Sequence, residues 1–130
     1  MIEIQEEIIL KEISDLLMNE LPKYLLELEE QSGDGASLLP LRYAGPEGAM
    51  PVGTGAPYAF IRIEEGKCTE KDRIIKNVVY TVYIQWKILE YRLIWRYYTA
   101  FLICIDAFSL GNCEITEKKT TGDLCLQIKR

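Results

Sequence analysis

The sequence predicts an α+β fold in the order α-β-β-α-β-β, with a four-stranded, mostly antiparallel sheet flanked by two helices. Residues 2–20 and 90–110 repeat apolar side chains at helical spacing. Residues 57–65 and 77–88 alternate apolar and polar side chains around a charged connector, which is typical of a long antiparallel hairpin. Residues 112–118 and 123–130 form a second, shorter alternating pair. Because strands grouped between helices build one covered sheet, we expect a single domain over residues 1–130.

The first predicted helix is amphipathic, with acidic side chains away from an apolar stripe. The stripe comprises Ile2, Ile9, Ile13, Leu16, Leu17 and Leu21. Pro22 is expected to end or kink this helix near Glu20, because proline lacks the backbone donor and clashes with the preceding turn. Residues 23–31 favour one or two further helical turns.

Residues 32–57 predict a long loop, since they hold four of the five prolines and most of the glycines. A loop of this length is unusual inside a compact domain. Two interpretations are open: a disordered insertion, or an arm that becomes ordered against a neighbouring molecule.

The predicted hairpin has one apolar face and one mixed face. The apolar face carries Ala59, Ile61, Ile63, Val78, Tyr80, Val82, Ile84, Trp86 and Ile88. The other face carries Tyr58, Phe60, Arg62, Glu64, Thr81, Tyr83, Gln85 and Lys87. An outward aromatic strip of Tyr58, Phe60 and Tyr83 indicates a contact with another protein.

The second predicted helix is apolar nearly all round, so we expect it to be the more buried one, and Gly111 should end it. Most aromatic residues outside the strip are assigned to the core: Tyr80, Trp86, Trp95, Tyr97, Tyr98, Phe101 and Phe108. In the last strand, Leu124, Leu126 and Ile128 alternate with Cys125, Gln127 and Lys129.

Charge is unevenly distributed along the 130 residues, whose net charge is −5. Residues 1–31 carry nine acidic residues and two lysines, a net charge of −7, and the remainder is slightly positive. Phosphate binding needs clustered Lys and Arg, so we expect no specific nucleic-acid partner. The acidic helix, with Glu12 and Asp15, is either a solvated face or a surface that meets a complementary subunit.

The sequence offers little catalytic chemistry. Histidine is absent, which excludes Ser-His-Asp and Cys-His catalysis, and no phosphate-binding glycine loop occurs. The four cysteines form no CxxC, and we expect free thiols, with Cys104 buried. A placement of Cys113 opposite Cys125 across the last hairpin is left open. We therefore expect no metal site, no cofactor and no enzymatic activity.

The carboxylates around the hairpin connector are Glu64, Glu65, Glu70 and Asp72. They alternate with Lys67, Lys71 and Arg73, which is typical of a solvated turn. The N-terminus has no basic region before an apolar segment, and the apolar run near Phe101 is too short to span a bilayer. The sequence is therefore expected to be that of a soluble, intracellular protein without a membrane partner.

The order of these segments resembles that of bacteriophage tail terminator and tail completion proteins, including head–tail joining proteins of similar fold. The resemblance is carried by a helix ending near "LLMNELPKYL", a loop ending "APYAFIRIEE", a charged turn "KCTEKDR", a strand "VVYTVYIQW", a helix "WRYYTAFLICI" and a closing strand pair. It covers nearly the whole chain, although the 32–57 loop has no motif that maps onto the family.

The resemblance implies a ring, commonly a hexamer, at the head-proximal end of the tail tube, without catalytic site or cofactor. Its partners would be copies of the chain, the tail tube protein and a head-completion protein, first in the host cytoplasm and then in the virion. The candidate subunit interface is Tyr58, Phe60, Arg62, Lys67, Glu70, Lys71, Tyr83, Glu12 and Asp15. Two other functions stay open: a binding module for a peptide or small molecule, and a small enzyme using Glu64, Glu65 or Asp72.

Overall fold

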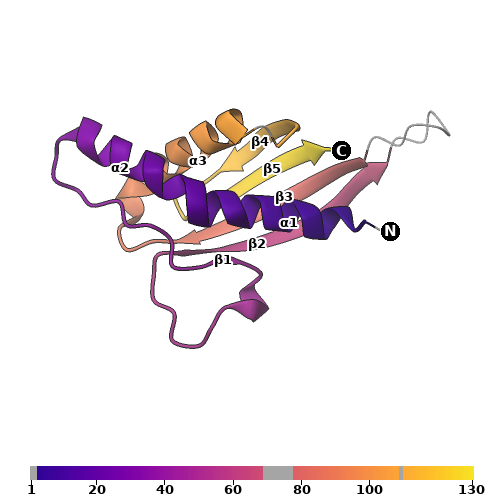
Figure 1. Ribbon diagram of the computed structural model, residues 1–130, viewed down its shortest axis with the longest axis horizontal. Helices are drawn as coiled ribbons and strands as arrows, with labels where there is room; N and C mark the ends of the chain where they lie inside the picture. The colour runs from indigo at the N-terminus through magenta and orange to yellow at the C-terminus, as the bar shows by residue number, and fades with distance from the viewer. Residues whose placement is uncertain (1–2, 69–77, 109) are drawn as a thin grey trace.

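The computed structural model describes residues 3–68, 78–108 and 110–130 and shows an α+β fold, as the sequence predicts (Figure 1). The helices are α1 (Gln5–Asp15), α2 (Leu21–Ser32) and α3 (Ile94–Phe108). The strands are β1 (Ala44–Gly45), β2 (Tyr58–Cys68), β3 (Val78–Lys87), β4 (Asn112–Lys118) and β5 (Asp123–Lys129). Short 3-10 turns at Glu47–Ala49 and Tyr91–Leu93 complete the described elements.

The described strands form a five-stranded mixed sheet in the order β1-β2-β3-β5-β4. Strand β1 runs parallel to β2, and the other neighbours are antiparallel. The predicted sheet of four strands is therefore wrong in number. The additional strand has only two residues and lies in the Gly/Pro-rich segment, so no alternating pattern could reveal it.

The N-terminal helix continues past the expected break at Pro22. A π-helical turn, Leu16–Glu20, joins α1 to α2, and Pro22 lies in the first turn of α2, a position that the fixed φ of proline favours. Helix α2 then runs to Ser32 and ends at Gly33, which adopts a left-handed conformation with φ of 61°.

The predicted loop at residues 32–57 divides into two parts. Its first part is attached to the body: the Leu38 N–H donates to Glu29 Oε2 at 3.1 Å, and the Tyr97 hydroxyl donates to the Leu39 carbonyl at 2.9 Å. The Ser14 hydroxyl donates to the Ala44 carbonyl at 2.6 Å and so ties α1 to β1. Its second part, beyond Gly45, projects from the sheet (Figure 1).

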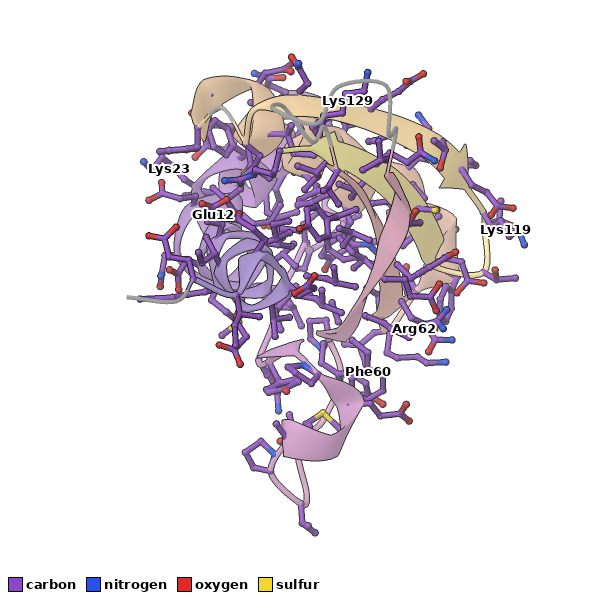
Figure 2. All side chains as sticks on the ribbon, turned by 90° about the vertical axis from the view of Figure 1, so that its right-hand side faces the viewer. Glu12, Lys23, Phe60, Arg62, Lys119 and Lys129 are labelled. Carbon is purple, nitrogen blue, oxygen red and sulfur yellow. The ribbon has the colours of Figure 1, made fainter. Side chains whose placement is uncertain are left out.

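The helices lie on one side of the curved sheet, and none of the described helices covers the opposite side (Figure 2). The core between the two layers centres on Trp86, whose ring centroid lies 6.0 Å from that of Tyr97, 6.1 Å from that of Tyr98 and 5.8 Å from that of Phe101. The predicted core residues that are buried include Ile9, Ile13, Leu16, Leu17, Leu21, Ala59, Ile61, Val82, Ile84, Trp86, Leu124, Leu126 and Ile128. Ile2 lies outside the described residues.

Two aromatic residues assigned to the core are exposed. Trp95 is 47% exposed, because it lies out of phase with the buried stripe of α3, and its ring packs edge-on against Tyr98. Phe108 is 43% exposed; it is the last residue of α3 and lines a hollow that opens to solvent.

The possible placement of Cys113 opposite Cys125 is not observed. Cys113 lies opposite Ile128 and Cys125 lies opposite Glu117, because the register of the β4–β5 pair sets these two cysteines about three residues apart. Cys104 is buried as predicted, and the described thiols are free.

Candidate assembly surface

The uncovered face of the sheet is the candidate assembly surface, and we call it the open face. Alternation along β2 and β3 places Tyr58, Phe60, Arg62 and Tyr83 there, since their neighbours in sequence face the core. The strand register sets Arg62 opposite Tyr83, and Tyr83 opposite Cys125 on β5. Four of the predicted interface residues therefore lie together.

Contacts within this strip hold its side chains in place. The Arg62 guanidinium carbon lies 4.4 Å from the centroid of the Tyr83 ring, a cation–π contact. The same guanidinium donates to Glu64 Oε1 at 2.7 Å. The Tyr58 and Phe60 rings pack against each other with centroids 5.0 Å apart. A partner would meet an already ordered aromatic and cationic strip.

A shallow hollow of about 550 Å³ adjoins the strip. The residues that line it are Pro46, Glu47, Phe60, Ile61, Arg62, Tyr83, Ile84, Gln85, Glu117, Lys119, Asp123, Leu124 and Cys125. Figure 2 shows Phe60, Arg62 and Lys119 on this side of the molecule, away from Glu12 on the helices. Charges of both signs surround an aromatic floor, which resembles the rim and centre of a protein interface.

Glu12 and Asp15, which were also predicted to lie at the interface, do not join the strip. Glu12 lies on α1 and forms a two-pronged ion pair with Arg130, with Nη1 and Oε1 3.4 Å apart. Glu12 and Asp15 line a separate hollow of about 530 Å³ beside Phe108 and Leu110. The Lys67 side chain, Glu70 and Lys71 lie outside the described residues, as do the side chain of Glu65 and Asp72.

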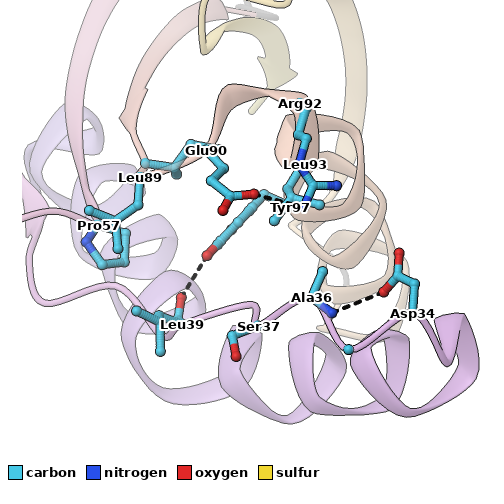
Figure 3. Close-up of a pocket in the computed structure, with 12 residues that line it drawn as sticks. Asp34, Ala36, Ser37, Leu39, Pro57, Leu89, Glu90, Arg92, Leu93 and Tyr97 are labelled. Atoms are coloured by element: carbon cyan, nitrogen blue, oxygen red, sulfur yellow. Dashed lines mark hydrogen bonds and ion pairs between the residues drawn. The ribbon is translucent and has the colours of Figure 1, made fainter.

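A third surface region was not predicted from the sequence. At the end of the molecule where α2, the β3–α3 connection and α3 meet, a hollow of about 390 Å³ opens between Leu39, Pro57, Leu89 and Leu93, and we call it the end hollow (Figure 3). Sequence reasoning missed it because its walls come from segments that lie far apart in the chain.

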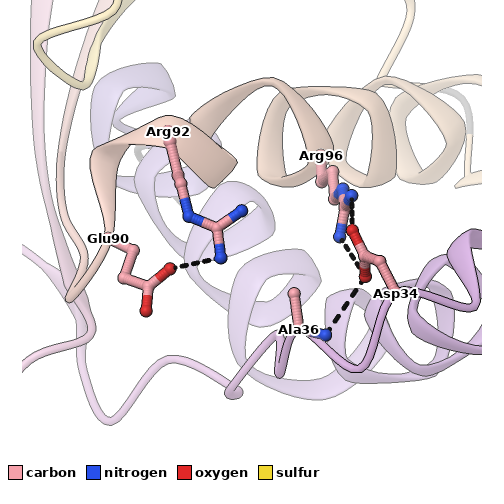
Figure 4. Close-up of polar contacts among 5 residues, drawn as sticks. All are labelled: Asp34, Ala36, Glu90, Arg92 and Arg96. Atoms are coloured by element: carbon pink, nitrogen blue, oxygen red, sulfur yellow. Dashed lines mark hydrogen bonds and ion pairs between the residues drawn. The ribbon is translucent and has the colours of Figure 1, made fainter.

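Two ion pairs flank the end hollow (Figure 4). Asp34 accepts from Arg96 through both carboxylate oxygens, with Oδ1 3.2 Å from Nη1, and also accepts from the Ala36 N–H at 3.1 Å. The hydrogen bonds from Arg96 lower the pKa of Asp34 to about 2. Arg92 pairs with Glu90 at 2.9 Å.

Burial disfavours the ionised, nucleophilic forms of several thiols and phenols. Burial raises the pKa of both Cys104 and Cys113 to about 11, so these thiols are protonated at neutral pH and weakly nucleophilic. It likewise raises the pKa of Tyr97 and Tyr98 to about 12. Among residues 3–68, 78–108 and 110–130, no group of three or more His, Cys, Asp or Glu is arranged to hold a metal ion.

None of the helices in the described part of the chain has the length and hydropathy that crossing a membrane requires. No protein-family model, curated protein or solved structure matches this chain. Fold and surface together define an α+β protein with one sheet face covered by helices and one face open.

Proposed function

We propose that this protein is a structural virion assembly protein, whose copies form a ring at the end of a phage tail tube, where the ring terminates the tail and joins it to the head. The observation that carries this proposal is the open face, where Tyr58, Phe60, Arg62 and Tyr83 form an ordered strip that none of the described helices covers. The resemblance of the sequence to tail terminator and tail completion proteins supplies the particular role.

The composition of the strip supports protein contact. Tyr, Phe and Arg are enriched in interfaces because they offer large contact areas together with a polar group. Burial of an exposed aromatic strip by a partner lowers the free energy of the complex. This stabilisation needs no bound cofactor and no catalytic residue. The proposed partners are five further copies in a hexameric ring, by analogy with the family, together with the tail tube protein and a head-completion protein.

The hollow on the open face favours a second candidate function. Its volume of about 550 Å³ lies within the range of pockets that hold small ligands, and Phe60 and Tyr83 would supply flat contacts. The alternative is therefore an α+β module that binds a peptide or small molecule through its sheet.

Native mass spectrometry over a concentration series, backed by light scattering, tests the proposal. We expect a hexamer or a monomer–hexamer equilibrium, and rings by electron microscopy. Phe60→Ala and Tyr83→Ala should weaken this association without unfolding the protein. Trp95→Ala is the matched control, since Trp95 is an exposed aromatic residue on α3. A monomer at every concentration would favour the binding module.

A further inference from the structure

An arm projects from the β1 edge of the sheet (Figure 1), and we define it as residues 46–56. None of its residues is buried, and Val52 at its tip is fully exposed. The tip is a β-turn in which both the N–H and the hydroxyl of Thr54 donate to the Pro51 carbonyl, at 3.3 and 2.7 Å. Gly53 has a φ of 88°, which this turn requires and few other residues adopt.

The base of the arm is also fixed by its own hydrogen bonds. The Tyr43 hydroxyl donates to the Pro46 carbonyl, and the Arg42 N–H donates to the Pro57 carbonyl at 2.8 Å. Gly45 lies so close to Tyr43 that a Cβ atom there would come within 2.8 Å of the phenol oxygen. The arm therefore has a definite shape without packing against its own core.

The arm is chemically distinct from the rest of the surface. No charged residue occurs between Gly48 and Pro57, although 27% of the chain is charged. Ala49, Met50, Pro51 and Val52 instead present apolar surface to water. An uncharged, preformed turn binds best to a surface whose own charged groups are already paired, because burying an unpaired charge is costly.

The end hollow provides such a place (Figure 3). Leu89 and Leu39 on its walls are 67% and 40% exposed, so apolar area there is available for burial. The charged groups at its rim are already paired, Glu90 with Arg92 and Asp34 with Arg96 (Figure 4). An uncharged guest complements a rim whose charges are neutralised in this way.

We propose that the arm of one copy docks in the end hollow of the next copy, with Val52 between Leu39 and Leu89. The inference rests on the proposed function and adds a contact between copies that is separate from the one on the open face. The arm and the hollow are different surfaces, so the contact is heterologous: each copy offers an arm to one neighbour and a hollow to another. Repetition of such a contact closes into a ring when the rotation between copies allows it.

Two charged substitutions test this contact by breaking it from either side. Val52→Asp places a carboxylate on the tip, and Leu89→Asp places one in the hollow. Both side chains are exposed in the single chain, so neither change should affect folding. Each variant alone should associate at least about tenfold more weakly than the wild type. Leu26→Asp, at an exposed leucine on α2, is the matched control and should associate normally.

Mixing the two variants gives the decisive result in native mass spectrometry. The Val52→Asp chain retains an intact hollow and the Leu89→Asp chain retains an intact arm, so the mixture should form a 1:1 heterodimer at concentrations where neither variant associates with itself. If the wild type assembles and the Val52→Asp variant assembles equally well, the arm does not dock in the hollow, although the ring proposal would stand. A mixture without heterodimer would have the same meaning. A wild type that remains monomeric at every concentration would overturn both the ring and the docking.

Discussion

At the scale of single residues, Trp86 shows how the core is specified. Its indole is fully buried and packs at steep angles against Tyr98 and Phe101, with no hydrogen-bond acceptor for Nε1 among the described atoms. Aromatic rings packed edge-on stabilise one another beyond the area they bury. A smaller residue at this position would therefore leave a large cavity and lose these ring contacts.

Alanine substitution separates core residues from residues of the open face. Trp86→Ala and Phe101→Ala should each reduce the free energy of unfolding by about 3–5 kcal/mol, because both side chains are fully buried. Phe60→Ala and Tyr83→Ala should change it much less, since both side chains are partly exposed. Urea denaturation of the four variants measures the difference; equal losses at all four positions would contradict the assignment of the two faces.

The Asp34–Arg96 pair predicts a dependence of stability on acid pH. The pKa of Asp34 is lowered from 3.8 to about 2 in the folded chain, so its contribution is fully present above pH 4 and is lost as the pH falls toward 2. Denaturation midpoints between pH 6 and pH 2 should fall less steeply for Asp34→Asn than for the wild type. Parallel curves would show that the pair contributes nothing to stability.

At the scale of elements, the β4–β5 turn depends on one glycine. Gly122 has a φ of 93°, and a Cβ atom there would lie 2.4 Å from the Trp86 carbonyl oxygen. The same residue accepts a hydrogen bond from the Trp86 N–H at 2.8 Å, so the turn cannot move away without losing it.

Gly122→Ala should therefore destabilise the protein more than Gly53→Ala, a matched change at a φ of 88° with no atom within 4 Å. The control should cost about 1–2 kcal/mol from backbone strain alone, and Gly122→Ala should add the cost of the clash to this. Thermal unfolding of both variants provides the comparison. Equal melting temperatures would mean that the turn adjusts freely.

Elements with strong local periodicity could be predicted from the sequence. The β4 and β5 bounds, the two faces of β2 and β3, and the buried stripe of α1 follow from alternation or helical spacing over many residues. The fifth strand could not, because β1 has only two residues, and the π-helical turn could not, because it is only five residues long and lies within a continuous helical pattern. Trp95 was misassigned because an almost wholly apolar helix does not show which side faces the core.

The candidate surface was predicted in part for the same reason. Tyr58, Phe60, Arg62 and Tyr83 share a face by the two-residue period of a strand. The contacts of Asp34 with Arg96 and of Glu12 with Arg130 join residues far apart in the sequence, and no local pattern reports them. The end hollow escaped prediction because three separate segments build it.

At the scale of the whole molecule, the described surfaces point in different directions. The strip lies on the open face, the arm projects beyond β1, and the end hollow lies where α2 meets the start of α3 (Figures 1 and 3). A receptor for a single ligand needs only one such surface. A ring subunit that contacts neighbouring copies through several surfaces, as well as a tube or head protein, has a use for all of them, which favours the proposed role in assembly.

The π-helical turn has a consequence for the geometry of the N-terminal helices. The fully buried residues Ile9, Ile13, Leu17, Leu21 and Leu25 recur every fourth position. Four residues of an α-helix rotate about 40° too far, so a stripe with this period winds around the axis. A π turn holds about 4.4 residues and falls short of a full rotation by about 33°. One such turn roughly halves the accumulated angle, so the buried residues of α1 and α2 stay closer to one side of the helix than they would in an uninterrupted α-helix.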